Sequence, residues 1–256
     1  MTEALKAQAI ELVKRKKFAE AEGPCRALLA AEPNDPYHPV NLAMVLNRLN
    51  RFAEAEALCR PVLARVPDFP PALERLANLL RVTGRLEEAE ATYKRLIARV
   101  PTRADAWDGL ALTYQGMGRY GDAFKAFGKA ISLEPNKPDY KANAGMCHVL
   151  VGEFAKGLPL YEHRKRMDFF PKRKFTAPEW DGGPLKGALL VHGEQGFGDQ
   201  MQMARFLGPL HARGIKVILE CRPELVRLFK TCPYVQTVIA RGTKPPPYAV
   251  HAWMLS

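Results

Sequence analysis

Four stretches of the sequence repeat one short pattern: RKKFAEAE at residues 15–22, LNRFAEAE at 49–56, TGRLEEAE at 83–90 and MGRYGDAF at 117–124. They follow one another at a constant interval of 34 residues, which we call the repeat period. One alanine and one proline recur with the same period: Ala21, Ala55, Ala89 and Ala123, then Pro33, Pro67, Pro101 and Pro135. A fixed period of this length is typical of a repeat protein whose units stack side by side.

The third unit predicts two antiparallel helices joined by a turn. Apolar residues at helical spacing mark one face of each helix. These residues are Leu73, Leu76, Ala77 and Leu80 in the first helix and Leu86, Ala89, Tyr93 and Leu96 in the second. Gly84 separates the two helices, since glycine accepts the positive φ of a helix end. The recurring alanine is small enough for the paired helices to cross closely, and neighbouring pairs must stack to bury their apolar faces.

The repeated pattern resembles the tetratricopeptide repeat family. The fourth unit carries the family's signature residue types, with WDGLALTY at residues 107–114 followed by Gly118, Ala123, Phe127, Ala130 and Pro135. The second unit departs from the pattern, because Pro39 stands where a large aromatic residue is usual and Asn50 stands where a turn glycine is usual. The resemblance implies a solenoid of helical hairpins.

A fifth unit holds the spacing with Gly145, Gly152, Phe154, Gly157 and Tyr161, although Phe169 replaces the exit proline. Residues 2–170 are therefore expected to form about five repeats. Three prolines, Pro24, Pro61 and Pro159, fall inside second helices and should bend or shorten them.

The composition excludes several classes of protein. The chain has 256 residues, with 38 Lys and Arg against 27 Asp and Glu, and a formal net charge of +11. No apolar run reaches the about 18 residues of a membrane-spanning helix, and the charged, amphipathic start lacks the apolar centre of a signal peptide. We therefore expect a cytoplasmic protein.

Cysteine and histidine spacing predicts neither a metal site nor a disulfide framework. The five cysteines form no C-x-x-C pair, and the histidines form no spaced cluster. Cys25 and Cys59 lie one repeat period apart, at the packing position that Tyr93 and Phe127 occupy in later units. This position favours a role in the core over a redox role.

Six positive charges gather between Arg164 and Lys174. No aromatic residues are interleaved at base-stacking spacing, and no nucleic-acid motif is present. A solvated linker explains these charges better than a site for nucleic acid or anionic lipid, which is the minor alternative.

The resemblance implies a binding groove, because the first helices of such a solenoid line a concave surface that commonly receives a segment of another protein. By the family's register the groove-facing residues are Val40, Met44, Asn47, Arg48, Glu74, Asn78, Arg81, Val82, Asp108, Leu112 and Gln115. Peptide-carboxylate clamps in the family use Asn, Lys and Arg at these places, and this chain supplies part of such a set in Asn47, Arg48, Asn78 and Arg81. The alternative is that all these residues are ordinary solvated side chains.

Beyond about residue 175 the helical period gives way to alternating strands and helices. Strands are predicted at 187–192, 215–221 and 235–242 and near the chain end, with helices at 199–214 and 222–232. Short connections imply a parallel sheet with right-handed crossovers. The fold class is thus α followed by α/β, in which a basic linker at 171–186 joins the solenoid to a partial Rossmann-like sheet at 187–256.

The loop after the first predicted strand is rich in glycine. GEQGFG at residues 193–198 reads G-x-x-G-x-G, so it is not the dinucleotide-binding fingerprint. Asp199 is expected at the helix N-cap, where the helix dipole favours the ionised carboxylate, and such a carboxylate can accept a proton from a hydroxyl. The alternative for Asp199 is that it only caps the helix. The alternative for His192 is a structural role at the strand end.

A second resemblance covers PEWDGGPLKGALLVHGEQGFGDQMQMAR at residues 178–205. This passage is similar to a domain that follows tetratricopeptide repeats in many bacterial proteins and is related to heptosyltransferase-like glycosyltransferases of the GT-B fold. In that family a Gly-Asp pair supplies the general base, which Gly198 and Asp199 match. The resemblance implies metal-free inverting transfer with Asp199 as the catalytic residue. The substrate-binding candidates are His192, Glu194, Gln195, Gly196, Gly198, Gln202 and Arg205.

Residues 178–256 are too few for a two-lobed transferase, whose C-terminal lobe binds the nucleotide-sugar. We therefore expect a truncated product that is inactive by itself and has no cofactor, with a nucleotide-sugar donor and a glycan or protein acceptor implied for a longer parent. The leading interpretation is a protein-binding scaffold joined to the acceptor-side half of a glycosyltransferase-like domain. The alternative is an interaction module with a non-catalytic α/β remnant.

Overall fold

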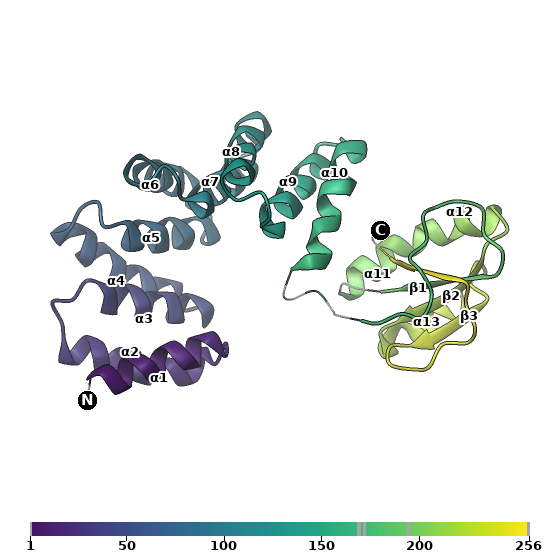
Figure 1. Cartoon of the computed structure of the whole chain (residues 1–256), viewed down its shortest axis with the longest axis horizontal. Helices are drawn as coiled ribbons and strands as arrows, with labels where there is room; N and C mark the ends of the chain where they lie inside the picture. The colour runs from purple at the N-terminus through teal and green to yellow at the C-terminus, as the bar shows by residue number, and fades with distance from the viewer. Residues whose placement is uncertain (1, 168–169, 171–172, 194–195, 255–256) are drawn as a thin grey trace. The chain divides into compact units, whose positions relative to one another are not determined.

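The computed structural model describes residues 2–167, 170, 173–193 and 196–254. The chain divides into two compact units, Met1–Arg164 and Lys165–Ser256. The first unit is helical and the second contains a small parallel sheet (Figure 1). Among the described residues, no helix has the length and apolar character needed to cross a membrane.

Helical hairpins follow one another in chain order through the first unit (Figure 1). The helices are α1 (Thr2–Lys14), α2 (Phe18–Ala31), α3 (Tyr37–Arg48), α4 (Phe52–Arg65), α5 (Pro70–Val82), α6 (Leu86–Arg99), α7 (Ala104–Gly116), α8 (Tyr120–Leu133), α9 (Pro138–Leu150) and α10 (Phe154–Tyr161). Each odd-numbered helix packs against the even-numbered helix that follows it and, from α3 onward, against the one before it. The predicted helix-turn-helix units are thereby confirmed.

One backbone conformation recurs in the turn inside every hairpin. Lys16, Asn50, Gly84, Gly118 and Gly152 all have positive φ, between 59° and 84°, and each follows the last by one repeat period. Asparagine tolerates the left-handed region better than most residues. Asn50 can therefore replace the usual glycine without changing the turn.

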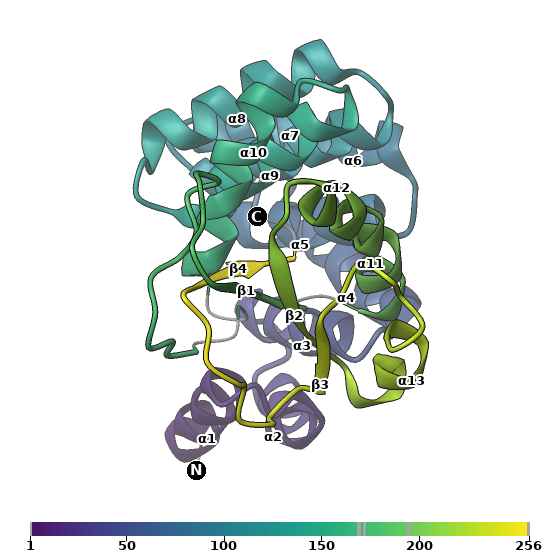
Figure 2. The same cartoon turned by 90° about the vertical axis from the view of Figure 1, so that its right-hand side faces the viewer.

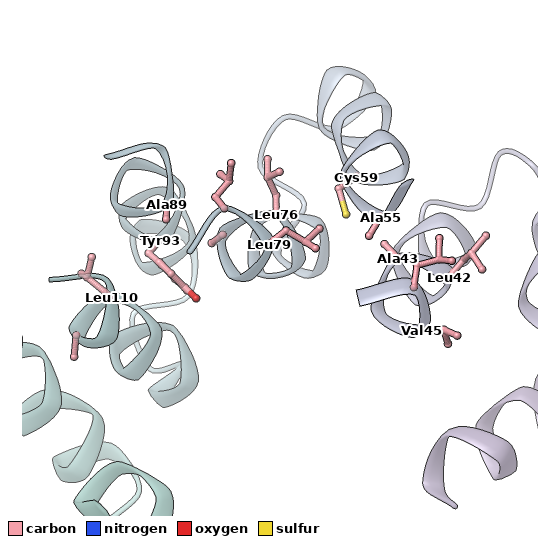
Figure 3. Packing of buried hydrophobic residues seen from close by; sticks show 14 of the residues in the cluster. Leu42, Ala43, Val45, Ala55, Cys59, Leu76, Leu79, Ala89, Tyr93 and Leu110 are labelled. Atoms are coloured by element: carbon pink, nitrogen blue, oxygen red, sulfur yellow. The ribbon is translucent and has the colours of Figure 1, made fainter. Parts of the chain in front are cut away.

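The core lies between the two helices of each hairpin and between neighbouring hairpins. The four recurring alanines are completely buried, because the paired helices cross at these positions. Cys59 and Tyr93 occupy equivalent places in successive units and lie in the same apolar cluster (Figure 3). Cys25 and Cys59 are 4% and 0% exposed, which confirms their role as core residues.

Of the three prolines expected to bend or shorten second helices, Pro24 and Pro61 leave the length of their helices unchanged. Pro24 lies in α2 and Pro61 in α4, and both helices have 14 residues, as do α6 and α8 without proline. Continued packing against the neighbouring helices holds these segments helical despite the lost hydrogen bond. Pro159 lies in α10, which has 8 residues and passes into a 3-10 turn at Glu162–Arg166.

Consecutive first helices also contact one another, α3 with α5, α5 with α7 and α7 with α9. This places the odd-numbered helices on the inner side of the curve that the hairpins follow (Figure 1). Val40, however, is 2% exposed and packs with Val62 and Ala72, so it belongs to the core and not to the groove.

The second unit contains four parallel strands in the order β3-β2-β1-β4 (Figure 2). The strands are β1 (Ala188–His192), β2 (Lys216–Cys221), β3 (Thr237–Ala240) and β4 (Val250–Trp253). Leu189, Val217 and Leu219 lie in the apolar core of this unit. The predicted parallel sheet is confirmed, although β3 is shorter than the predicted segment 235–242.

The helices of the second unit are shorter than the sequence pattern predicts. The expected helix 199–214 consists of α11 (Phe197–Met203), a 3-10 turn (Ala204–Phe206) and α12 (Leu207–Ala212). Pro209 is the third residue of α12, in the first turn of a helix, where its missing N–H costs no intrahelical hydrogen bond. The expected helix 222–232 consists of a 3-10 turn (Pro223–Leu225) and α13 (Val226–Phe229).

Candidate functional site

The predicted groove residues of α5 and α7 make polar contacts with neighbouring side chains. The carboxylate of Glu74 pairs with Arg103 at 2.7 Å. Asn78 accepts a hydrogen bond from the Tyr93 hydroxyl at 2.8 Å and donates to the backbone carbonyl of Glu74 at 3.0 Å. These bonds orient both side chains, so the central groove has a defined polar surface.

Asp108 lies beside this set, on α7. Both of its carboxylate oxygens accept hydrogen bonds from the Asn143 side chain, at 3.1 Å each. Burial raises the pKa of Asp108 to about 6, and the hydrogen bonds from Asn143 oppose this rise. Asp108 is therefore mostly ionised at neutral pH and becomes protonated in mildly acidic solution.

Arg81 and Gln115 each carry a buried polar atom without a hydrogen-bond partner among the described residues. The atoms are Arg81 Nε, a donor, and Gln115 Oε1, an acceptor. The two residues are one repeat period apart, so they occupy the same place on the consecutive first helices α5 and α7. An unpaired buried polar atom costs about 1–3 kcal/mol, and a bound ligand could satisfy both atoms.

Asn47 and Arg48 lie on α3, one repeat closer to the N-terminus than Glu74, Asn78 and Arg81 on α5, and Asp108 and Gln115 lie on α7. Asn47 is partly exposed, and the exposed guanidinium of Arg48 lies 5.8 Å from the centre of the Phe18 ring. That these residues line a binding groove stays a prediction.

A cavity in the first unit was not predicted from the sequence. Residues of α1, α2 and α3 enclose a cavity of about 380 Å³. Ile10 and Val13 of α1 line it, together with Met44 of α3. The repeat register could have found them, because Ile10 precedes Met44 and Val13 precedes Asn47 by one repeat period.

An acidic group with one histidine borders this cavity. His38 Nε2 lies 2.8 Å from a carboxylate oxygen of Glu32 and 3.5 Å from one of Asp35. Glu32, Asp35 and His38 each offer one atom that could bind a metal ion, and these three atoms lie within 4.8 Å of one another. His38 is 4% exposed. Lys6 lies 3.5 Å from Glu32 and supplies a positive charge to the same group.

The glycine-rich loop of the second unit leads into α11. Gly196 is the N-cap residue, and Asp199 is the third residue of the helix, so the expected N-cap position of Asp199 is wrong. The exposed carboxylate of Asp199 reaches back and accepts the backbone N–H of Gly196 at 3.1 Å. This bond is the half of a capping box that the third helical residue supplies, since Gly196 has no side chain for the other half, and the role of Asp199 as a general base stays a prediction.

His192 is fully buried at the carboxyl end of β1. Its Nε2 lies 3.2 Å from Nδ1 of His251, and its ring stacks on Phe175 at 4.3 Å between centroids. Burial, together with the nearby Arg173 guanidinium, lowers the pKa of His192 to about 2, so the ring is neutral. The surrounding aromatic rings place this side chain within the packed interior of the unit.

The other predicted substrate-binding residues do not converge. Gln202 is exposed, and Arg205 is exposed with its guanidinium 5.0 Å from the centre of the Phe206 ring. Gly198 lies within α11. Glu194 and Gln195, like Phe169 of the fifth repeat, lie outside the described residues.

Gln200 was not predicted and is a buried polar residue of α11, directly after this loop. It is 1% exposed, and its Oε1 accepts the backbone N–H of Arg222 at 3.3 Å. A side chain on Gly193 would meet the Gln200 amide at 2.5 Å, which explains the glycine at that position.

Comparisons with known proteins agree with the helical architecture. Tetratricopeptide repeat models match residues 6–70, 46–112 and 104–137. No curated protein matches the chain.

Solved structures are similar to the helical unit. MamA (41-end) from Desulfovibrio magneticus RS-1 is 20% identical, with a TM-score of 0.55 over 65% of this chain and 97% of that protein. A thermophilic tetratricopeptide-repeat protein from Thermus thermophilus is 18% identical, with a TM-score of 0.61 over 66% of this chain and 92% of that protein. At these identities the likeness concerns the fold. The helical unit of this chain is therefore a tetratricopeptide-repeat solenoid.

Proposed function

We propose that this chain is a protein-binding scaffold whose groove receives an extended peptide segment of a partner. The observation that carries the proposal is the pair of buried, unpaired polar atoms among the described residues, Arg81 Nε and Gln115 Oε1, at one position of consecutive repeats.

A peptide backbone matches this pair because every residue other than proline presents one carbonyl acceptor and one N–H donor. A carbonyl oxygen would accept from Arg81, and a backbone N–H would donate to Gln115. The polar surface around them is held in place before binding, since Asn78 is fixed by Tyr93 and Asp108 by Asn143. Such preorganisation lowers the entropy lost on association.

The test compares partner capture by the wild type and two variants at equal concentration. The groove variant is Arg81→Ala with Gln115→Ala, and the matched control is Lys129→Ala, an exposed cation on α8. We expect the wild type and the control to retain the same proteins from a cell extract and the groove variant to lose them. Identical sets of captured proteins for all three would reject the central groove as the binding site.

The α/β unit supports a second candidate function, glycosyl transfer. The order β3-β2-β1-β4 of parallel strands is compatible with part of a doubly wound sheet, and ligands of such sheets bind at the carboxyl ends of the strands. Asp199 follows β1 at this edge. In a longer parent protein that includes a nucleotide-sugar-binding lobe, Asp199→Ala should abolish transfer from a panel of nucleotide-sugars, and Glu224→Ala, an exposed carboxylate control, should not. Turnover that survives Asp199→Ala, or a parent protein without transfer, would discard this candidate.

A further inference from the structure

We infer that the cavity between α1 and α3 is a second binding subsite, which takes a large apolar side chain from a segment with acidic residues on one side of it. The inference rests on the proposed peptide-binding function. It concerns a different part of the groove, one repeat or more away from Arg81 and Gln115.

Apolar side chains line the middle of the cavity, between its two charged ends. Ile10 and Val13 come from α1, Met44 comes from α3, and Cys25 and Leu28 of α2 form the floor. Ile10 is 55% exposed although it lies on a cavity wall. A volume of about 380 Å³ lies at the lower end of the about 300–1,000 Å³ found for ligand pockets. It therefore suits one large side chain or two small ones.

Lys14 of α1 lines one end of the cavity, and Arg48 lies one helical turn beyond the lining residue Met44 on α3. Lys14 and Arg48 are one repeat period apart, in the last turns of α1 and α3, and both are exposed. No salt bridge involves either side chain among the residues that the structure describes. The nearby charges of Arg15 and Lys17, by contrast, are paired with Glu11 and Glu20.

The opposite end is acidic. Glu32, Asp35 and the buried His38 converge there, and Lys6 at that end pairs with both Glu3 and Glu32. His38 and Arg48 are ten residues apart on α3, or about 15 Å along the helix axis. The cavity thus separates a negative end from a positive end.

This charge distribution determines the occupant and its direction. An acidic residue beside the apolar anchor would be attracted toward Lys14 and Arg48 and repelled from Glu32 and Asp35. A basic segment has the opposite preference and would be repelled by the same two cations. We therefore commit to an apolar–acidic peptide segment as the occupant.

The binding experiment uses fluorescein-labelled ten-residue peptides and fluorescence anisotropy. The parent peptide has one leucine followed by three glutamates in a serine–glycine background. One companion replaces the leucine by alanine, and the other replaces the glutamates by lysines. We expect the parent to bind at least about tenfold tighter than the alanine peptide, because burying a leucine side chain is worth at least that factor. The lysine peptide should bind weakly at low salt.

Protein variants locate the subsite. Ile10→Asp should weaken binding of the parent peptide about tenfold or more. Because Ile10 is exposed, the substitution should leave the circular dichroism spectrum unchanged. Lys14→Glu with Arg48→Glu should weaken binding and reverse its dependence on salt, because added salt then screens a repulsion. Lys129→Glu is the matched charge reversal on the outer helix α8 and should have no effect.

Several results would overturn the inference. The inference is wrong if the leucine and alanine peptides bind equally well, if Ile10→Asp leaves binding unchanged, or if the wild type binds no peptide. Dimerisation that disappears in Ile10→Asp would assign the cavity to a second copy of the chain and would overturn it too. Peptide binding that persists in the Arg81→Ala, Gln115→Ala variant would uphold the subsite even if the central groove fails its own capture test.

Discussion

Gly145 of α9 and Gly157 of α10 face each other at the closest approach of their two helices. A Cβ atom on Gly145 would lie 2.8 Å from the carbonyl oxygen of Gly157, and one on Gly157 would lie 2.8 Å from that of Gly145. The same Cβ on Gly145 would lie 2.4 Å from the backbone nitrogen of Tyr161. Backbone atoms cannot rotate away as side chains do, so this pair requires glycine on both sides.

Gly145→Ala should therefore destabilise the solenoid by about 1–3 kcal/mol, the usual cost of overpacking. Gly128→Ala in α8 is the matched control, since a Cβ there has no neighbour within 4 Å. The control should be neutral or stabilising by up to about 1 kcal/mol, as alanine favours the helix. Urea unfolding followed by circular dichroism measures both changes, and equal effects would contradict the crossing geometry.

A repeated ion pair connects neighbouring hairpins, and it should make stability depend on pH. Arg85 donates to both oxygens of Glu56 at 2.9 Å, as Arg51 does to Glu22 one unit earlier. Burial opposes ionisation of Glu56, but hydrogen bonds from Arg60 and Arg85 outweigh it and lower the pKa of Glu56 below 4.5.

A lowered carboxyl pKa stabilises the fold above the unfolded value of about 4.5, and this contribution is lost as the pH falls through the folded pKa. Glu56→Gln should therefore lower the Tm by about 1–3 °C at pH 7 and have little effect below the folded pKa. Thermal melts of both proteins across this pH range test the prediction. A difference that does not change with pH would show that the charge of Glu56 is not its cause.

Asp108 should show the opposite pH dependence. Its pKa is raised by burial to about 6, so the folded state holds a proton more tightly than the unfolded state, with a reference value of 3.8. The charged groups facing it are Arg81, Asp105 and Asp139, and Asn143 donates to it. Folding stability from this residue should fall as the pH rises from about 4 to 6.

Asp108→Asn should consequently stabilise the protein above pH 7, by at most about 3 kcal/mol, and should have little effect near pH 4. Urea titrations at both pH values provide the measurement. A variant that is less stable than the wild type at pH 7 would mean that the ionised carboxylate is better satisfied than its burial indicates.

Thiol reactivity should follow burial. Cys59 is fully buried, and desolvation raises its pKa to about 12, whereas Cys232 is partly exposed. Iodoacetamide should modify Cys232 in the native protein and Cys59 only after unfolding, because the thiolate is the reactive form. Mass spectrometry of peptides alkylated with and without urea distinguishes the two. Rapid native labelling of Cys59 would contradict its place in the core.

The repeat architecture could be predicted because its causes are local and periodic. The spacing of Leu73, Leu76 and Leu80 indicates which helix face is buried, and Gly84 indicates where the turn must adopt positive φ. The central groove residues were predicted from the same register and stay a prediction. The register extends to Ile10 and Val13, but the cavity beside them depends on how α1 packs against α2 and α3.

The α/β unit was harder to predict in detail, because short helices are set by their surroundings. Strand segments such as 187–192 were recognisable as apolar runs, but the break between α11 and α12 and the buried position of Gln200 depend on contacts with distant residues. Asp199 was expected at the N-cap, whereas Gly196 holds that place and Asp199 is the third helical residue.

The sequence by itself determined the period, the helix pairing, the crossing alanines and the parallel order of a small sheet, because each depends on residues close together in the chain or on a repeated spacing. Tertiary structure alone decided which polar atoms are buried without partners among the described residues, as at Arg81 and Gln115, and where a cavity opens between α1 and α3. Whether a polar atom is buried, and whether it has a hydrogen-bond partner, depends on side chains that come together from different helices. A local sequence pattern does not contain this information.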